Sequence, residues 1–285
     1  MSFIIIDIEP DSPEHFEFRK GKIGASHAPD IMGVGFHSPL QLWEELSFDR
    51  PRRKTASMQR GNDLEKEARA WVNAKLKVDY QPKIIQSMEH PWRIASLDGY
   101  YKREGKHYLL EIKCPGHQDH LQAVGGNVPE KYNPQLQHQM DLADVDHMFY
   151  CSFDGEEAAL VVVERDKAYC KELLREETVF KWRLDKFVAP EPSDKDWMEI
   201  KDSEAVLKAE RLRELKLLID ELEEEETDLK SDLEAALKHS RCKIGNMKVK
   251  RVTKVGNFDY KKIEEETGID LEKYRKSPVT YWSWT

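Results

Sequence analysis

Three charged residues stand on two short apolar stretches: Asp98 in SLDGYY (96–101), and Glu111 and Lys113 in YLLEIKCPG (108–116). Two carboxylates brought together can hold a hard divalent cation through oxygen ligands. Side chains alternate along a strand, so the lysine two residues after the glutamate points to the same face. A cation held there lowers the pKa of water, and an ammonium group stabilises developing negative charge. These residue types at this spacing are typical of phosphodiester hydrolysis.

Each of these two motifs, taken singly, has a simpler structural explanation. Asp-Gly after a strand is usually a turn, and Glu-x-Lys is usually a surface pair. However, Glu111 and Lys113 interrupt a stretch that is otherwise apolar, at Leu109, Leu110 and Ile112. Such stretches are typical of central strands, in which charged groups need partners. A metal ion would supply one partner.

A further carboxylate, Glu65, lies on a long predicted helix in RGNDLEKEAR (60–69). Gly61, near the start of this helix, would let it approach another part of the molecule closely. Glu65 is either an exposed helix residue or a third carboxylate near the metal.

Amide side chains recur in YNPQLQHQM (132–140). Residues at i and i+4 share a helix face, so Gln135 and Gln139 align whereas Gln137 does not. An amide can bind a phosphate oxygen or a water molecule on a metal, and Tyr132 could contact the same DNA backbone. The alternative is that these residues lie on a helix surface.

Arg19 and Ser26 lie in FRKGKIGASHAPDIMG (18–33). We expect Ser26 to cap a short helix that runs into the Gly33–Gly35 turn. An arginine together with a helix N-terminus that bears a serine hydroxyl would suit a terminal phosphate.

The hydrophobic pattern around these residues predicts a sheet flanked by helices, an α/β or α+β fold. Helices are expected from Ser38–Pro39 and at 56–77, 117–124, 129–142 and 166–187. Strands are expected at 83–88, 93–97, 99–102, 108–114, 148–153 and 158–164. The first four would form an antiparallel meander, with Gly105 in its last turn and with Asp98 and Glu111 near the middle of adjacent strands.

The segment VAPEPSD (188–194) has two prolines and no periodic apolar face, so we place a boundary there, between a core at 1–190 and an extension at 191–285. Residues 203–238 are predicted to be helical, with the acidic block Glu223–Glu226. Their heptad-like leucines are Leu215, Leu218, Leu222 and Leu229. This region is either a self-associating coiled coil, an antiparallel helical hairpin or one solvated helix.

Residues 242–255 alternate as a β-hairpin around Gly245–Asn246. The lysine-rich face formed by Lys248, Lys250 and Lys254 could touch phosphate, but such a face is more often a solvated edge that resists strand pairing. We expect the aromatic tail TYWSWT to pack on the core.

The composition narrows the classes of protein. The 285 residues are 39% hydrophobic and 35% charged, which is typical of a globular protein. Residues 191–285 carry 19 Lys and Arg against 23 Asp and Glu, and residues 1–190 carry 26 against 31. Neither part is basic, so non-specific wrapping of nucleic acid is disfavoured, whereas a locally basic channel is compatible with this balance.

Targeting and cysteine patterns point to the cytosol. The chain has no apolar run long enough to span a membrane, and its start, MSFIIIDIEP, is not a secretory signal. The four cysteines form no CxxC pair and no zinc spacing, so reduced thiols are expected.

Several motifs occur together in one order along residues 16–187. They are Arg19…Ser26, RGNDLEKEAR, SLDG, LLEIKCP, YNPQLQHQ and VVVERDKAY. Together they resemble the phage lambda exonuclease and the YqaJ-like viral recombinase nucleases, within the PD-(D/E)xK nuclease superfamily. Leu97 stands where the superfamily name places proline, so the match at this motif rests on Asp98.

The resemblance implies a mixed β-sheet flanked by helices and a set of residue roles. Asp98 and Glu111 would bind Mg²⁺ together with the Ile112 carbonyl, with Mn²⁺ as a substitute, and Lys113 would orient or activate the attacking water. Glu65 would be an accessory acidic residue, and Gln135 would place the scissile phosphate or the water. Arg19 and Ser26 would bind the 5′-phosphate, with Tyr132 and Gln139 as further DNA contacts.

The resemblance also implies an activity. It implies Mg²⁺-dependent, processive 5′→3′ digestion of one strand of linear duplex DNA to leave 3′ overhangs, for homologous recombination by strand annealing. A toroidal homo-oligomer, commonly a trimer, would encircle the duplex, and a phage single-strand annealing protein would be the partner. The protein would act in the cytoplasm of a bacterial host, as a phage or prophage product.

Two other functions stay open on the residues. One is a structure-selective or site-specific DNA endonuclease of the same superfamily. The other is a non-catalytic scaffold that binds DNA or a partner through the C-terminal region.

Overall fold

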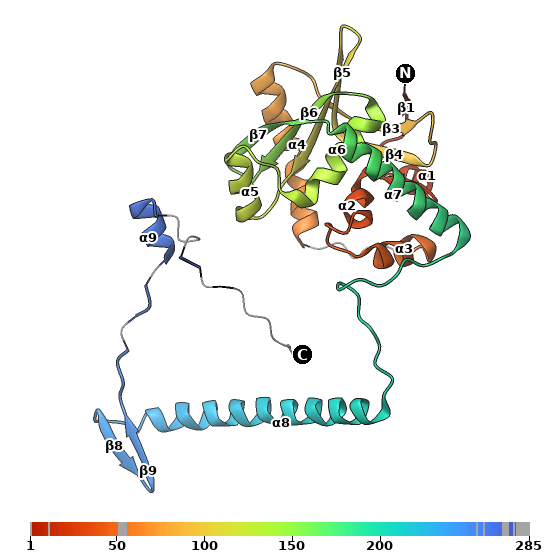
Figure 1. The fold of residues 1–285 in the computed structure, drawn as a ribbon. Helices are drawn as coiled ribbons and strands as arrows, with labels where there is room; N and C mark the ends of the chain where they lie inside the picture. Colours follow the sequence, from red (N-terminus) through yellow and green to blue (C-terminus); the bar gives the residue numbers. More distant parts are fainter. Residues whose placement is uncertain are drawn as a thin grey trace. The chain divides into compact units, whose positions relative to one another are not determined.

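The computed structural model describes residues 2–10, 12–50, 56–254, 256–258, 260–269, 274, 275 and 277 (Figure 1). The chain divides into two compact units, Met1–Glu199 and Ile200–Thr285. The first unit holds a seven-stranded sheet and the residues expected to do chemistry. The second unit holds a long helix and a separate two-stranded sheet.

The large sheet is mixed, so the expected fold class is confirmed. Its order is β1 (Phe3–Ile6), β3 (Gln81–Ser87), β4 (Arg93–Arg103), β5 (Lys106–Lys113), β6 (His147–Phe153) and β7 (Ala158–Glu164), with β2 (Ile23–Gly24) paired to β4. The β5–β6 and β2–β4 pairs are parallel, and the other pairs are antiparallel.

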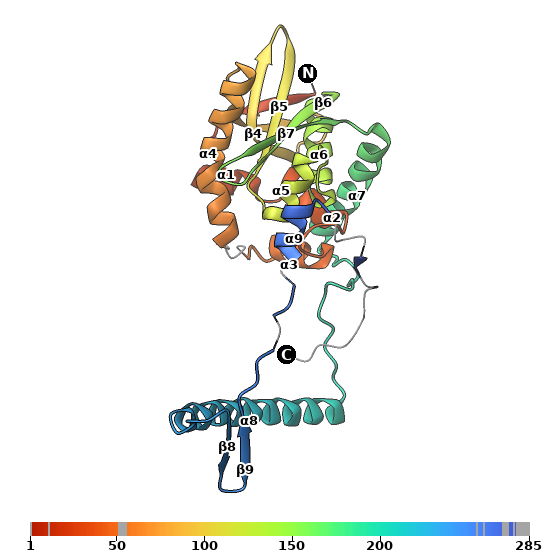
Figure 2. The same ribbon diagram turned by 90° about the vertical axis from the view of Figure 1, so that its left-hand side faces the viewer.

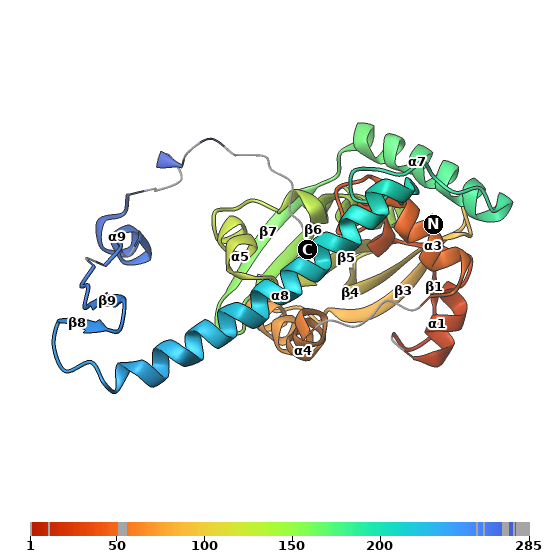
Figure 3. The ribbon, with the colours of Figure 1, turned by 90° about the horizontal axis from the view of Figure 1, so that it is seen from below.

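Helices cover both faces of the sheet. The helix α4 (Ala56–Leu76) lies on one face, and α6 (Asn133–Ala143) and α7 (Lys167–Lys186) lie on the other, as Figures 2 and 3 show. β5 explains why this arrangement follows from the sequence. Leu109 packs in the cluster that contains α6, whereas Leu110 and Ile112 pack in the cluster that contains α4. A strand buried on both faces reads as a continuous apolar run.

Short helices connect these layers. They are α1 (Pro13–Arg19), the 3₁₀ helix η1 (Ala25–His27), α2 (Ala28–Ile31), α3 (Pro39–Ser47), α5 (His117–Val124) and the 3₁₀ helix η2 (Glu130–Tyr132). The start of α3 agrees with the sequence, because the Ser38 hydroxyl accepts the Gln41 N–H and the Gln41 side chain accepts the Ser38 N–H. Asp166 likewise caps α7.

The meander expectation is confirmed with one correction. Residues 93–97 and 99–102 belong to one strand, β4, so the meander has three strands and Asp98–Gly99 is not a turn. The turn at Gly105 is present, with φ +80°. The helix expected at 129–142 is two elements, η2 and α6, because Pro134 in the first turn of α6 donates no backbone hydrogen bond to a preceding turn. The strands β1 and β2 and the helix α1 were not predicted.

A buried ionic network joins β4, α6 and α7. Arg93 Nη1 lies 2.8 Å from Asp141 Oδ2, and Arg93 Nε lies 2.8 Å from Glu177 Oε2. The other Glu177 oxygen lies 2.5 Å from His138 Nδ1, and His138 Nε2 lies 3.1 Å from the Ile94 carbonyl oxygen. Glu177 and His138 are fully buried, so this network fixes the two helices against the sheet.

The segment that follows α7 is tied to the first unit. The Lys195 ammonium donates to the carbonyl oxygens of Gly33 and Gly35, at 2.9 and 2.6 Å. The Ser38 hydroxyl donates to Asp196 Oδ1 at 2.5 Å. These contacts explain why the first compact unit runs to Glu199, past the prolines on which the predicted boundary after residue 190 is based.

The second unit contains α8 (Ser203–Glu234), β8 (Arg241–Ile244), β9 (Met247–Lys250) and α9 (Tyr260–Thr267). The helix is continuous, so the expectation of a helical hairpin at 203–238 is wrong (Figure 1). Its leucines are exposed in this single chain, Leu222 by 54%, so the choice between a solvated helix and self-association stays open. The β-hairpin around Gly245–Asn246 is confirmed but is shorter than 242–255, and the tail TYWSWT lies outside the described residues.

Among the described residues, no helix has the length and apolar character needed to cross a membrane. All four cysteines are free thiols.

Candidate active site

A β-bulge in β4 shapes the site. Gln81 pairs with Tyr100 and Lys83 pairs with Leu97, so a two-residue step on β3 faces a three-residue step on β4. The additional residue places the bulge at Asp98–Gly99. Bulges are frequent next to active sites because they re-aim a side chain.

Gly99 is required by the close packing at this bulge. A Cβ atom at Gly99 would lie 2.9 Å from the Cβ atoms of Leu110 and Tyr80. Neither neighbour can yield easily, because Cβ atoms move only with the backbone. Glycine therefore lets β4 approach β5 at the residue next to Asp98.

The Asp98 side chain reaches β5 where the strand ladder stops. The recorded β4–β5 pairs run from Arg103↔Lys106 to Gly99↔Leu110. At the next step, Asp98 Oδ2 accepts the Ile112 N–H at 2.7 Å, so a carboxylate takes the place of a main-chain partner. The structure thus brings Asp98 to the part of β5 that carries Glu111 and Lys113.

The Glu111 carboxylate is the centre of a hydrogen-bond network. Glu111 is 1% exposed. Its Oε1 accepts from Lys113 Nζ and from Gln135 Nε2, each at 2.5 Å, and its Oε2 accepts from Gln139 Nε2 at 2.6 Å. Both amides belong to α6, on the face of the sheet to which Glu111 points, so they do not lie on a helix surface. Gln137 has a different role, since its amide nitrogen donates to the Glu164 carbonyl.

The three central charges influence one another strongly. Burial raises the pKa of Asp98 well above its ordinary value, and the nearby carboxylates of Glu111 and Glu65 raise it further, against the opposing effect of Lys113. Burial lowers the pKa of Lys113, but Glu111 and Asp98 raise it by more, so its net pKa is raised. Carboxylates crowded in this way favour a bound cation.

Glu65 approaches the site from α4 and forms an ion pair with Arg69. Arg69 Nε donates to the Asp98 carbonyl oxygen at 2.5 Å. Arg69 therefore links the third carboxylate to the bulge. The sequence interpretation missed Arg69, although its position four residues after Glu65 on a helix is the spacing at which opposite charges pair.

A Cβ atom at Gly61 would meet nothing within 4 Å among the described residues. The expectation that this glycine lets α4 approach another part of the chain is therefore wrong for this structure.

The donor set fits Mg²⁺. The carboxylate oxygens of Asp98 and Glu111 and the Ile112 carbonyl are hard ligands of the kind that this ion prefers. The donors around Glu111 are flexible side-chain groups that can give way to a cation. Among the described residues no cluster of three His, Cys, Asp or Glu side chains surrounds a common point, so main-chain oxygen and water would complete the coordination.

Arg19 and Ser26 lie together in a second polar cluster. Arg19 Nη2 lies 3.4 Å from Ser26 Oγ and 3.3 Å from His27 Nε2. Ser26 does not cap a helix as expected: it lies within η1, whose N-cap residue is Gly24, and the Gly24 N–H donates to His27 Nδ1 at 3.2 Å. The sequence interpretation did not include His27.

Tyr132 and Gln139 were both expected to contact DNA. The ring of Tyr132 stacks on Tyr150, with centroids 6.0 Å apart, and Lys113 Nζ lies 5.7 Å from its centroid. Gln139, in contrast, is fully buried and donates to Glu111. In this structure Gln139 therefore positions the carboxylate.

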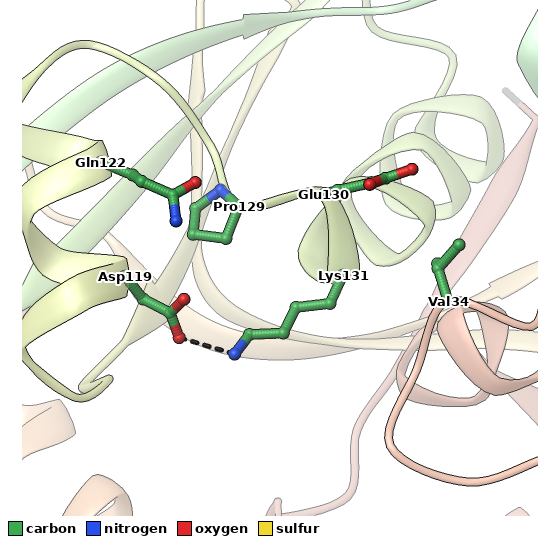
Figure 4. A pocket seen from close by; sticks show the side chains of 6 residues that line it. All are labelled: Val34, Asp119, Gln122, Pro129, Glu130 and Lys131. Carbon is green, nitrogen blue, oxygen red and sulfur yellow. Dashed lines mark ion pairs between the residues drawn. The ribbon is translucent and has the colours of Figure 1, made fainter. Parts of the chain in front are cut away.

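A surface pocket of about 360 Å³ lies beside Tyr132 (Figure 4). Lys131 lines it and pairs with Asp119 of α5 at 2.6 Å. Lys131 Nζ is also 5.3 Å from the centroid of the Tyr132 ring and 5.0 Å from that of Phe36, which is 76% exposed. Cations and aromatic rings thus border the carboxylate site on this side.

Comparisons with known proteins agree with this geometry. Residues 14–146 match the model of the YqaJ-like viral recombinase domain. No curated protein matches the chain.

Two solved structures of one protein are similar to this chain. The crystal structure of the alkaline exonuclease LHK-Exo from Laribacter hongkongensis is 27% identical with a TM-score of 0.56, over 62% of this chain and 94% of that chain. The structure of LHK-Exo in complex with dAMP is 28% identical, with the same TM-score and coverage. The family expected from the sequence motifs is confirmed: this chain contains a YqaJ-like viral recombinase domain, at residues 14–146.

Proposed function

We propose that this protein is a Mg²⁺-dependent exonuclease that degrades one strand of linear double-stranded DNA in the 5′→3′ direction and leaves 3′ overhangs. The family match and the similarity to an alkaline exonuclease support a phage-type nuclease. The observation that carries the proposal is the Glu111 carboxylate. It is bound by Lys113, Gln135 and Gln139, next to the Asp98 carboxylate on the bulge.

Each residue has a chemical role in this proposal. Asp98, Glu111 and the Ile112 carbonyl would hold Mg²⁺, which supplies Lewis-acid polarisation of the scissile phosphate and a lower pKa for water. Mn²⁺ would substitute because it prefers similar oxygen ligands. Lys113, as an ammonium group, orients the attacking water and stabilises negative charge on the phosphate. Gln135 positions the phosphate or the water, and Glu65 supports the site from α4.

Substrate polarity would come from the second polar cluster. An arginine and a hydroxyl are suited to a terminal phosphate, so Arg19 and Ser26 would bind the 5′-phosphate. Tyr132 would contact the DNA backbone beside Lys113. The 3′ overhangs would serve homologous recombination, in which a phage single-strand annealing protein loads onto them. We further propose a homo-oligomeric ring, such as a trimer, around the duplex, acting in the cytoplasm of a bacterial host.

End-labelled DNA tests this proposal. The full chain is incubated with linear duplex that carries a label on the 5′ end or on the 3′ end of one strand, with Mg²⁺ or with EDTA. We expect early release of the 5′ label, late release of the 3′ label, and no release in EDTA. Early release of the 3′ label would reverse the polarity, and digestion in EDTA would contradict metal catalysis.

Two additional substrates separate the alternatives. Covalently closed plasmid should stay intact, because an exonuclease needs an end, and its cleavage would favour an endonuclease. A duplex with 5′-hydroxyl ends should be digested more slowly than one with 5′-phosphates. Equal rates would remove Arg19 and Ser26 from end recognition. No cleavage of any substrate, together with no Mg²⁺ binding, would favour a non-catalytic scaffold.

A further inference from the structure

The hairpin β8–β9 has a face made of cations. Arg241 pairs directly with Lys250, and Lys243 pairs directly with Lys248. Directly opposite residues of an antiparallel pair project from the same face, so all four side chains lie on one face, and all four are exposed. We call this surface, formed by Arg241, Lys243, Lys248 and Lys250, the basic face.

The opposite face of the hairpin has a different character. It carries Cys242, Ile244, Met247 and Val249, and three of them are half-buried, with Met247 exposed. The alternation of cations and apolar residues therefore sorts the charges onto one side. Lys254, which the sequence pattern assigned to the lysine-rich face, lies beyond the end of β9.

The basic face is electrostatically unfavourable in the absence of an anion. Like charges directly opposite each other destabilise a strand pair. Within the part of the chain that the structure describes, no carboxylate forms an ion pair with any of the four side chains. The local sequence offers none either, because residues 235–258 contain seven Lys and Arg and no Asp or Glu. This occurs in a chain with a net charge of −9, so the positive charge is concentrated locally.

We propose that the basic face binds the phosphate backbone of nucleic acid, as a grip outside the nuclease unit. Four regularly spaced cations complement a row of phosphates. The basic face carries no aromatic or amide side chain, so it has no group to stack on bases or to read their edges, and contact with the backbone is sequence-independent. The choice of nucleic acid as the polyanion rests on the proposed function, whereas the grip itself requires no catalysis.

Salt dependence of binding measures this grip directly. Full-length protein is titrated in EDTA with a labelled duplex and with a single strand of the same length and sequence, over a range of salt concentrations. The hairpin variant combines R241Q, K243Q, K248Q and K250Q. Each lost phosphate contact lowers the slope of log K against log salt by about 0.9 for duplex and about 0.7 for a single strand. Between about 50 and 200 mM salt, the wild type should therefore lose roughly 150-fold more duplex affinity, or roughly 50-fold more single-strand affinity, than the hairpin variant.

Two control variants make the result specific. The variant with K208Q, R211Q, R213Q and K216Q removes the same charge from α8 in the same unit and should keep the wild-type slope. The variant with R241K, K243R, K248R and K250R keeps the charge on the hairpin and should also keep the wild-type slope. A larger slope change for duplex or for single strand identifies which nucleic acid the basic face binds.

Three outcomes would overturn the proposal. They are an unchanged slope in the hairpin variant for both nucleic acids, an equal loss in the α8 variant, and dissociation of an oligomer by the hairpin substitutions without a change of slope. The last outcome would assign the basic face to an acidic segment of a second copy. Failure of the proposed nuclease function would appear instead as absent cleavage in Mg²⁺ with normal binding in EDTA, so the two failures are distinguishable.

Discussion

At the scale of single residues, the buried Glu111 carboxylate organises the site. A buried carboxylate needs hydrogen-bond donors, and Glu111 obtains them from Lys113 on its own strand and from Gln135 and Gln139 on α6. The amides are therefore explained by the charge they surround. The i, i+4 spacing indicated that they share a face, and the structure shows that this face meets Glu111.

The Lys113 side chain supplies the first prediction. Lys113→Ala should lower the turnover rate about 10²–10³-fold, because it removes a group that stabilises charge mainly in the transition state. Affinity for duplex DNA, measured by titration in Ca²⁺ or EDTA, should stay close to that of the wild type. Lys106→Ala, at the exposed start of the same strand, is the matched control and should keep full activity. Full activity of Lys113→Ala would refute the assigned role.

The second prediction concerns the metal and Asp98. Mg²⁺ at about 100 times its Kd should stabilise the wild type by about 2.7 kcal/mol, seen as a Tm increase of roughly 5–10 °C. Asp98→Asn should lose this increase because a ligand charge is gone. Without metal the variant should be at least as stable as the wild type, because burial and Glu111 raise the pKa of Asp98 and so disfavour its charged form. An undiminished Mg²⁺-dependent increase in Tm for Asp98→Asn would exclude Asp98 as a ligand.

At the scale of secondary-structure elements, the bulge in β4 and the helices on either side of the sheet place the charges. β4 and β5 lie side by side up to Gly99↔Leu110, and the Asp98 side chain then bonds to the Ile112 main chain. α6 brings amides to Glu111 from one face, and α4 brings Glu65 and Arg69. Each of these elements contributes to the site, so distortion of one element should disturb several contacts together.

Gly99→Ala tests the bulge. The added methyl group would lie 2.9 Å from the Cβ atoms of Leu110 and Tyr80, so overpacking should destabilise the protein by about 1–3 kcal/mol and displace Asp98. Denaturant unfolding and nuclease assays would both report the change. Gly61→Ala, in the open on α4, should instead stabilise the protein by about 0.5–1 kcal/mol. Equal stabilities for the two variants would show that the bulge tolerates a side chain.

Glu177→Ala tests the network between β4, α6 and α7. This fully buried carboxylate faces Arg93 and His138, so its removal leaves buried charge uncompensated and should cost about 3–5 kcal/mol. Glu176→Ala, which removes the neighbouring carboxylate that pairs with Arg175 near the surface, should cost less than about 1 kcal/mol. Chemical denaturation of the two variants compares these costs, and equal losses would contradict a structural role for the network.

At the scale of the whole molecule, the chain is two compact units with different compositions. The first unit contains the matched recombinase domain and all the residues proposed for catalysis. The second contains α8, whose acidic C-terminal half precedes the basic hairpin. A catalytic unit followed by a charged extension would allow DNA to be held away from the point of cleavage.

Truncation tests where the catalytic domain ends. A chain that stops after Glu199 should fold and cleave duplex DNA, because the first unit keeps the contacts of Lys195 with Gly33 and Gly35. A chain that stops after residue 190, the boundary predicted from the prolines, should be less stable by about 1–2 kcal/mol, because the Ser38–Asp196 hydrogen bond is also lost. Thermal unfolding of both fragments measures the difference. Identical midpoints would support the earlier boundary.

The sequence by itself determined the mixed sheet, most element positions and the residues at the centre of the site. Periodicity along the chain reports which face of an element is buried, so the strands around Glu111 and the helix of Gln135 and Gln139 were predictable. Family motifs in one order identified the recombinase domain. These are local signals, carried by neighbouring residues.

Only the tertiary structure decided which groups meet. The bulge at Asp98–Gly99 arises from pairing with β3, which is distant in sequence, and the binding of Gln139 to Glu111 depends on the packing of α6 against β5. Cross-strand pairing likewise placed Arg241 and Lys243 on the same face as Lys250 and Lys248. Such relations depend on register between segments, and a one-residue change of register moves a side chain to the other face of the sheet.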